Sequence, residues 1–364
     1  MLNKKLLDEL AIADFGLLAD EICIDDRIDM RKYLLSPDGN FYKANLHCHT
    51  NISDGRLSPE EVKELYVSRG YSVVAYTDHD LFIPHHELTD EKFLALSGFE
   101  AEFNSAYPGK KFMQVCHLCF IAKSPDTVVM PCWNPDYAYI GNSKQHLGKI
   151  KFDPKTVGFV RKHTPENISA MIAECKKAGF FVTYNHPAWS MENYEQYTRY
   201  EGLDAMEILN YSCERLGYPA YADLIYDDML RANGKLFAIA ADDNHDKYPP
   251  DSPYSDACGG YVMIKAKSLD YETVINALCA GDFYASGGPS IYELYLEDGR
   301  VHVSCSDAAR ITLNAGHRAT KTVIAPDNAT VNGAVFDYKE DDLYLRITVK
   351  DREGKCAFSN AYFL

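Results

Sequence analysis

Residues 43–56 have the sequence KANLHCHTNISDGR, in which a short apolar segment runs into two histidines and then into a turn. We predict a β-strand over residues 43–46 that ends in His47-Cys48-His49. Because side chains alternate along an extended strand, His47 and His49 should point to one side and Cys48 to the other, as a packing residue. This pattern indicates a metal site, although it is not specific when taken alone.

Outside this segment, short β-branched or aromatic runs continue to alternate with helical patterns. Such alternation is typical of β-α units around a mostly parallel sheet. Helices are predicted from the capping box of Ser58 and Glu61, after Pro165, and around residues 221–231 and 271–280. Seven candidate strands favour an α/β fold with a distorted, TIM-like seven-stranded β/α barrel, and they cover residues 43–46, 73–77, 93–98, 112–115, 180–184, 205–209 and 236–240.

Histidines and acids follow six of these seven strands. In a barrel of parallel strands the reactive residues lie at the C-terminal strand ends. A single histidine is more simply explained as a hydrogen-bonded residue, but a collection at one edge indicates a joint metal site. Imidazole and carboxylate donors without a thiolate suit zinc, manganese or iron in a catalytic site. The candidate ligands at these strand ends are His47, His49, Asp54, His79, Glu100, His117, His186, Asp243 and His245, with Asp78, Asp80 and Asp242 as neighbouring acids.

The length of 364 residues predicts more than one domain. From about residue 290, segments of alternating polarity such as YELYLEDGRVHVSC, with Asp-Gly at 298–299, predict a small all-β, sandwich-like domain. We therefore expect a helical extension over residues 1–40 that packs on the barrel, the barrel over 41–289, and the β domain over 290–364.

Composition excludes several classes of protein. A net charge of −16 argues against stable binding of duplex nucleic acid. No apolar run approaches the ~20 residues of a membrane helix, and the first residues do not resemble a signal peptide. Eleven cysteines at scattered spacings suit reduced thiols, so we expect a cytoplasmic protein with no membrane partner.

The motifs LHCHTNISDG, TDHD, GFE, NHP and DDNH resemble, in this order, those of the PHP (polymerase and histidinol phosphatase) family of phosphoesterases. The resemblance covers about residues 43–290, and SGGPS at 286–290 with the β tail resembles a subgroup with an appended C-terminal β domain. It departs from the family at His117, whose surroundings lack the usual glycine, and at Asp54, where some relatives have histidine.

The resemblance implies two or three divalent metal ions. His47, His49, Glu100 and Asp243 match one set of ligands, Glu100 bridges to a second completed by His117 and His186, and Asp54, His79 and His245 match a third. It also implies that a metal-bound hydroxide attacks phosphorus. We hypothesise that His79 or His245 could instead act as the acid for the leaving oxygen if the third metal is absent. Three ions would bring +6 against −3 from the three acids, so the pocket should attract phosphate.

The segment 122–165 is too long for an ordinary βα loop. Between residues 141 and 163, six Lys or Arg face only Asp153. We hypothesise a lid whose aromatic residues, Trp133, Tyr137 and Tyr139, stack on a nucleoside while cations such as Lys149 and Lys151 hold phosphate. We also expect His85 to line the pocket. The alternatives are a solvated surface excursion and an ordinary loop histidine.

The predicted function is hydrolysis of a small phosphorylated metabolite, such as a nucleotide. Three alternatives stay open: an exonuclease on short oligonucleotides, hydrolysis of C–N or C–O bonds by a related metal barrel, and an inactive metal-binding or interaction protein.

Overall fold

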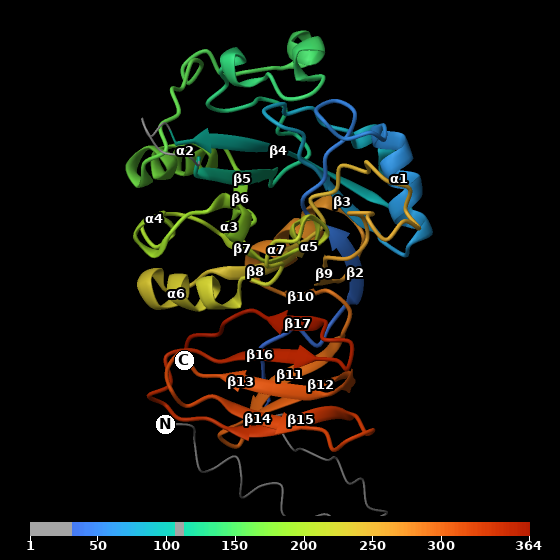
Figure 1. The fold of residues 1–364 in the computed structure, drawn as a ribbon, viewed down its shortest axis with the longest axis vertical. Helices are drawn as coiled ribbons and strands as arrows, with labels where there is room; N and C mark the ends of the chain where they lie inside the picture. Colours follow the sequence, from blue (N-terminus) through green and yellow to red (C-terminus); the bar gives the residue numbers. More distant parts are fainter. Residues whose placement is uncertain (1–30, 106–112) are drawn as a thin grey trace, which may run out of the picture. The chain divides into compact units, whose positions relative to one another are not determined.

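In the computed structural model, residues 31–105 and 113–364 are described, and Lys32–Leu364 form one unit of mixed α and β structure (Figure 1). Strand β2 (Asn40–Asn45) ends just before His47. Six further strands are its successive neighbours in one sheet: β3 (Val73–Tyr76), β4 (Leu94–Asn104), β5 (Val115–Ala122), β6 (Phe180–Tyr184), β7 (Ala205–Asn210) and β8 (Phe237–Ala241). No helix in the described ranges has the length and hydropathy needed to cross a membrane.

Strand β5 differs from the prediction in its bounds and its direction. The expected strand over 112–115 is wrong, because β5 begins at Val115 and runs antiparallel to both β4 and β6. Residue 112 itself lies outside the described ranges. Strand β4 extends to Asn104, and Glu102 near its end lies opposite His117 near the start of β5. The start of β5, and not its end, therefore lies at the edge of the sheet that carries the other histidines.

The sheet continues beyond β2 on its other side. There β2 pairs with β9 (Tyr261–Ala266), which pairs with β10 (Phe283–Ser286), both antiparallel. Between β2 and β8 the described backbone has one isolated parallel bridge, from Cys48 to Asn244. The fold is therefore α/β with a large sheet, and a closed seven-stranded barrel stays a prediction.

The four helices that the sequence predicts begin at, or within about two residues of, the expected positions, and three short helices were not predicted. In α1 (Pro59–Ser68), Ser58 accepts from the Glu61 backbone while the Glu61 side chain accepts from the Ser58 backbone, which satisfies two free N–H groups of the first turn. The other helices are α2 (Pro165–Lys177), α3 (Pro187–Ser190), α4 (Tyr194–Tyr197), α5 (Tyr211–Leu216), α6 (Asp223–Asn233) and α7 (Tyr271–Ala280), with 3-10 turns η2 (His86–Leu88), η3 (Pro135–Tyr137) and η4 (Ser143–Lys149).

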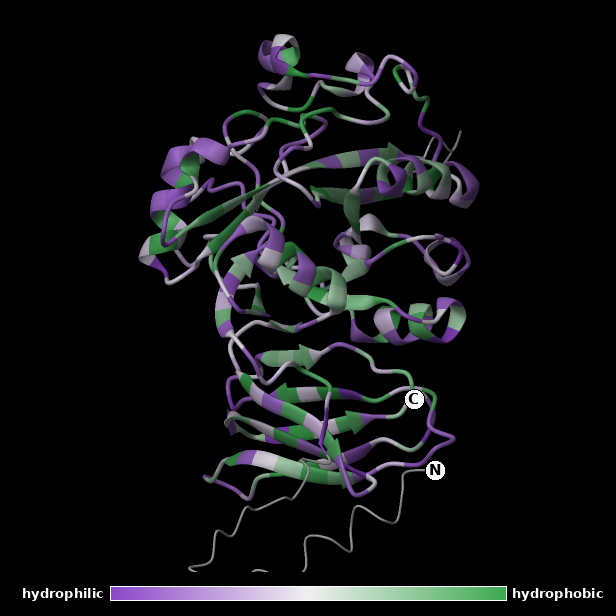
Figure 2. Ribbon diagram, turned by 180° about the vertical axis from the view of Figure 1, so that it is seen from behind, coloured by the Kyte–Doolittle hydropathy of each residue, from purple (hydrophilic) through white to green (hydrophobic). Residues whose placement is uncertain are grey.

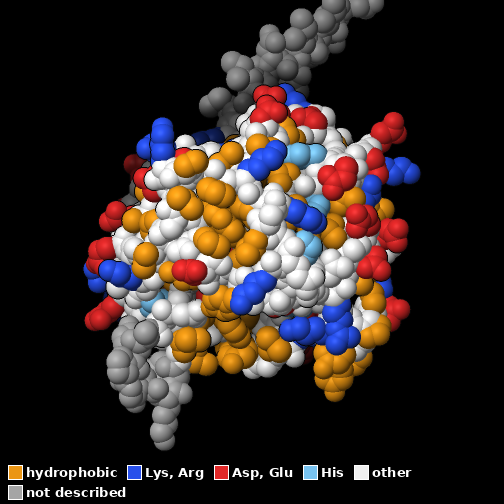
Figure 3. Space-filling view, turned by 90° about the horizontal axis from the view of Figure 1, so that it is seen from above, with side chains coloured by type: hydrophobic (Ala, Val, Ile, Leu, Met, Phe, Trp, Pro, Cys, Tyr) orange, Lys and Arg blue, Asp and Glu red, His pale blue; other side chains and the backbone are white. Residues whose placement is uncertain are grey.

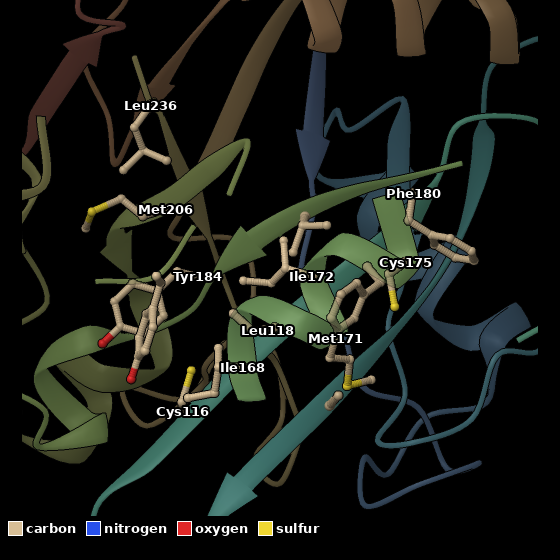
Figure 4. Packing of buried hydrophobic residues seen from close by; sticks show 14 of the residues in the cluster. Cys116, Leu118, Ile168, Met171, Ile172, Cys175, Phe180, Tyr184, Met206 and Leu236 are labelled. Carbon is tan, nitrogen blue, oxygen red and sulfur yellow. The ribbon is translucent and has the colours of Figure 1, made fainter. Parts of the chain in front are cut away.

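Hydrophobic stripes hold the helices against the sheet. Figure 2 shows helices striped in green and purple, as expected for one buried and one solvated face. On α2 the buried stripe consists of Ile168, Met171, Ile172 and Cys175, which lie beside Leu118 and Phe180 in Figure 4. Each fully buried side chain of this size contributes about 1.5–3 kcal/mol relative to exposure.

All described elements after residue 290 are strands, as predicted. Strands β11 (Ile291–Glu297) and β12 (Arg300–Ala308) form a hairpin around Asp298 and Gly299, both at positive φ. The remaining strands are β13 (Arg310–Asn314), β14 (Lys321–Ile324), β15 (Val331–Asp337), β16 (Arg346–Lys350) and β17 (Cys356–Ser359).

Two sheets share a hydrophobic core in this region. One has the order β1-β11-β12-β15, and the other, β14-β13-β16-β17, joins the large sheet through pairing of β17 with β10. Because hydrogen bonding crosses residue 290, the division into domains at 289/290 stays a prediction. Most of the predicted N-terminal extension, residues 1–30, lies outside the described residues. Its described end, β1 (Lys32–Tyr33), pairs with β11 and with none of the strands β2 to β8.

A buried ion pair also joins β16 to α6. Arg346 donates from Nε and Nη2 to the Asp227 carboxylate at 2.8 and 2.7 Å, and Tyr344 donates its hydroxyl to the same carboxylate at 2.8 Å. The Arg346 side chain is 1% exposed, so the Asp227 carboxylate is needed to stabilise its buried positive charge.

Candidate metal centre

The two histidines that follow β2 lie side by side. Their Nε2 atoms are 3.0 Å apart, while Cys48 between them packs in a hydrophobic cluster with Val62 and Tyr66, as its alternation in the strand predicts. Neighbouring backbone fixes the segment, because His49 N–H donates to Asn244 O and Asp243 N–H donates to His47 O.

Glu100 lies at the middle of the cluster. Its Oε1 is 3.2 Å from His47 Nε2, 3.1 Å from His117 Nδ1 and 3.5 Å from His186 Nε2. Its Oε2 is 3.1 Å from His79 Nδ1 and 3.5 Å from His49 Nε2. One buried carboxylate therefore faces five imidazoles that are supplied by four strands, β2, β3, β5 and β6.

Asp243 and His186 reach the cluster through unusual backbone conformations. Asp243 has a φ of 55° and His186 a φ of 27°, values that are costly for residues other than glycine and that cluster at functional sites. Asp243 Oδ1 lies 3.0 Å from His49 Nε2 and 3.2 Å from His47 Nε2, and its Oδ2 lies 3.9 Å from His186 Nε2.

A second region of the cluster surrounds Asp54. Its Oδ2 is 3.3 Å from His245 Nε2, and its Oδ1 is 3.9 Å from both His79 Nε2 and His49 Nδ1. The His49 ring stacks on the rings of His79 and His245, with centroids 4.4 and 4.5 Å away. All nine predicted ligands thus converge.

The donor atoms fall into three groups that could each hold an ion. The groups are His47, His49 and Glu100, then Glu100, His117 and His186, and finally His49, Asp54, His79 and His245, with all donor atoms of a group within 4.8 Å of one another. Within the described residues, buried Glu100 Oε2, His49 Nδ1 and His79 Nδ1 have no hydrogen-bond partner. Because buried polar atoms without partners are costly, these residues fit divalent cations. That the nine residues bind metal stays a prediction.

Two further acids hold candidate ligands in place. Glu207 Oε1 lies 2.7 Å from His47 Nδ1, and its Oε2 accepts from His186 N–H at 2.7 Å. Glu102 Oε2 lies 3.3 Å from His117 Nε2. A carboxylate on the far nitrogen of a ligating histidine fixes its tautomer and ring orientation.

The acids of the centre are held in their ionised form. Burial would raise the pKa of Glu100 and of Asp243, but neighbouring imidazoles hold both pKa values well below their usual range. Burial would likewise lower the pKa of His117 and His245, but facing carboxylates raise these pKa values to about 10 and about 9. Without metal, imidazolium protons therefore balance the carboxylates, and bound cations would replace those protons.

The centre opens into a cavity of about 400 Å³. Sequence reasoning missed most of its wall, because these residues lie on loops and on the short helices α3 and α5. Only Trp189, two residues after NHP, and Lys247, two residues after DDNH, lie close to a motif. Besides the candidate ligands, the wall includes Ile140, Trp189, Arg215, Leu216, Lys247, Tyr248 and Tyr254.

The four predicted substrate contacts do not line this cavity. Trp133 is only 4% exposed and packs in the core, so its ring has no face for a nucleoside. His85 is buried beside Tyr76 and Glu87. Lys149 and Lys151 are exposed, and Figure 3, viewed from the side of the segment 122–165, shows cationic side chains spread among hydrophobic ones. Local charge predicted the basic surface but not which cations face the pocket.

Fold and donor set together define a candidate divalent-metal centre on an α/β scaffold. Comparison with solved structures finds proteins to which this chain is similar. A two-domain protein from Bacteroides vulgatus, described as containing a predicted PHP-like metal-dependent phosphoesterase, is 14% identical, with a TM-score of 0.43 over 92% of this chain and 98% of that one.

Two other solved structures are also similar. A protein from Bifidobacterium adolescentis, described as a candidate metal-dependent phosphoesterase, is 18% identical over 68% of this chain and 98% of that one, with a TM-score of 0.38. An amidohydrolase from Chromobacterium violaceum is 17% identical over 56% of this chain and 87% of that one, with a TM-score of 0.33. No family model and no curated protein matches the chain.

Proposed function

We propose that the chain is a metal-dependent phosphoesterase that hydrolyses a small phosphorylated metabolite. The observation that carries the proposal is the convergence of eight of the nine predicted ligands into three overlapping groups, with Asp243 beside His47 and His49, at one cavity. The cavity volume of about 400 Å³ is within the range of small-molecule sites.

Zinc, manganese or iron would suit these donors. One ion would lie between His47, His49 and Glu100, with Asp243 beside them; a second would lie between Glu100, His117 and His186; a third would lie among Asp54, His79, His245 and His49. When bound, the ions would neutralise charge on phosphoryl oxygens and make a water molecule acidic enough to act as a nucleophile at neutral pH.

Cationic side chains of the wall would orient the phosphate. Lys247 is exposed and makes no ion pair with any described residue, so its ammonium is free to meet a phosphate oxygen. Arg215 also lines the wall, and its guanidinium is held by the Pro253 carbonyl, the Glu214 carboxylate and the ring of Tyr211. His79 and His245 also line the cavity, and if the third ion is absent either could give a proton to the leaving oxygen.

Aromatic side chains favour a nucleotide within this substrate class. Trp189, Tyr248 and Tyr254 line the cavity, and the two tyrosine rings lie 5.4 Å apart. Such rings can stack on a base. The net charge of −16 favours a mononucleotide over a long polyanion.

A phosphate-release screen tests the proposal. The metal-free protein is loaded separately with zinc, manganese or iron and assayed against nucleotides, sugar phosphates, amino-alcohol phosphates and short oligonucleotides. We expect turnover of a mononucleotide by the wild type, loss of turnover in His186→Ala, and retention in Glu166→Gln, whose carboxylate is exposed on α2. No turnover of any substrate with any of the three metals would refute the proposal.

A further inference from the structure

A second acid on β4 approaches the metal centre. Glu102 lies two residues after Glu100, so both side chains project from the same face of the strand. Oε2 of Glu102 is 3.3 Å from His117 Nε2. Its Oε1 accepts from the Tyr139 hydroxyl at 2.5 Å and from the Asn104 amide. Both oxygens are thus engaged within the protein, and Glu102 belongs to none of the three candidate groups.

The two ring nitrogens of His117 face different acids. Nδ1 lies 3.1 Å from Glu100, on the side of the candidate ion, and Nε2 faces Glu102. A neutral imidazole that ligates through Nδ1 carries its hydrogen on Nε2. Glu102 is placed to accept that hydrogen, which selects the ligating tautomer and fixes the ring.

The segment 122–165 holds Glu102 at two points. Tyr139 donates to its carboxylate, and Arg161 Nη1 donates to its backbone oxygen at 3.1 Å. The Arg161 side chain is 3% exposed, pairs with Asp80 and lies over the ring of Tyr137. These contacts connect the segment to the orientation of His117.

The same segment also rests on the loops that carry other candidate ligands. Asn142 N–H donates to Ser53 O at 2.7 Å, and Ser143 Oγ lies 3.3 Å from His79 O. Gly141 has a φ of 54°, and a Cβ there would meet Ser53 O at 2.0 Å, so only glycine permits this approach. The segment is therefore fixed against the centre at several sites.

We infer that Glu102 is a positioning residue for His117 and that Tyr139, through Glu102, makes the segment 122–165 a determinant of metal affinity. This inference rests on the proposed metal centre. It gives the segment a task that differs from the substrate lid predicted from its charge. Asn104 and Tyr139 orient the carboxylate, the carboxylate orients the imidazole, and the imidazole meets the ion.

Metal affinity tests the inference directly. Metal-free wild type, Glu102→Ala, Glu102→Gln and Tyr139→Phe are titrated with Zn²⁺ against a chromophoric chelator, and with Co²⁺ while its visible absorption is recorded. Tyr197→Phe is the matched control, because its hydroxyl also binds a carboxylate, that of Asp228 at 3.1 Å, but Asp228 contacts no candidate ligand.

We expect Glu102→Ala to lower the affinity for one ion by about 10- to 100-fold and to change the Co²⁺ spectrum. Glu102→Gln, which keeps an oxygen acceptor, should retain most of the affinity. Tyr139→Phe should lower the affinity for the same ion by about tenfold or less, because it removes one hydrogen bond to Glu102 while Glu102 itself is kept. Tyr197→Phe should match the wild type.

Three outcomes overturn the inference. The first is wild-type affinity and spectrum in both Glu102→Ala and Tyr139→Phe. The second is a lower thermal midpoint of the metal-free variants with unchanged affinity, which would make Glu102 structural only. If Glu102→Ala does not fold, unchanged affinity in Tyr139→Phe overturns the coupling by itself. Failure of the wild type to bind any ion would instead refute the proposed function.

Discussion

Glu100→Gln probes the centre directly, because it changes the charge of the side chain with little change in its volume. Glu100 belongs to two of the three candidate groups and lies 3.1–3.5 Å from five imidazoles. Asn185 donates to Glu100 Oε1 at 2.8 Å, a bond that a glutamine carbonyl can also accept. The substitution should therefore remove an anionic ligand while the local structure is kept.

The size of the effect follows from the donors that remain. Without Glu100, the group with His117 and His186 keeps two ring nitrogens, fewer than the three protein ligands of catalytic zinc sites. Substitution of a residue that only hydrogen-bonds to a metal ligand can lower metal affinity by roughly 100-fold, or about 2.8 kcal/mol. Loss of the ligand Glu100 should lower the affinity of this group by more than that. The group of His47 and His49 retains Asp243 nearby and should weaken less.

Metal content per polypeptide measures this effect. Wild type, Glu100→Gln and the exposed control Glu166→Gln are stripped with a chelator, reloaded with zinc or manganese, and measured by mass spectrometry of the metal and by chelator competition. We expect Glu100→Gln to lose one or two ions and most phosphate release, while the group around Asp54 keeps its ion. Wild-type stoichiometry and affinity in Glu100→Gln would refute the central role of this carboxylate.

Four further predictions follow from the described contacts. Asp54→Asn should remove at most one ion, and loss of all ions in the same metal measurement would contradict separate groups. Lys247→Ala should raise KM for the phosphorylated substrate by about tenfold or less, because the cation is exposed; an unchanged KM would exclude it from binding. Since His117 has a pKa of about 10 without metal, binding must displace its proton, so chelator competition should give an affinity that rises from pH 6 to pH 9; a flat profile would contradict this. Asp227→Asn should leave Arg346 buried without a carboxylate and lower the free energy of unfolding by about 3 kcal/mol, which an unchanged urea midpoint would contradict.

The nine convergent residues could be predicted because the pattern that encodes them is local. Alternation along a strand puts His47 and His49 on one face, and parallel strands separated by helices bring their C-terminal ends to one edge. His117 reached the predicted cluster although its strand was wrongly placed. Its position depends on the pairing of β4 with β5 across a long connection, and no local periodicity encodes which residues of a hairpin face each other.

The residues around the cluster were harder to predict, because they depend on the path of loops. Arg215 lies on the short helix α5, whose sequence carries no metal or phosphate motif. Trp189 follows NHP by two residues, but that motif predicts the ligand His186 and not which neighbouring side chain lines the cavity. The excess of lysines in the segment 122–165 was visible, yet its functional contacts come from Tyr139 and Arg161, which bind Glu102. Trp133, a plausible stacking residue in sequence, is covered by the core.

Strand β17 lies between β10 and β16, and the side chain of Asn360 just after it binds Ala238 N, Gly281 O and Phe283 O. During synthesis β10 leaves the ribosome long before β17 does. Until β17 has been made, the backbone N–H and C=O groups on that side of β10 have no hydrogen-bond partner. Unmated edges of this kind recruit other chains. A protein truncated before Cys356 would lack β17, so β10 and β16 would each keep an unpaired edge. We expect self-association, more than loss of activity, to be the first defect of such a protein.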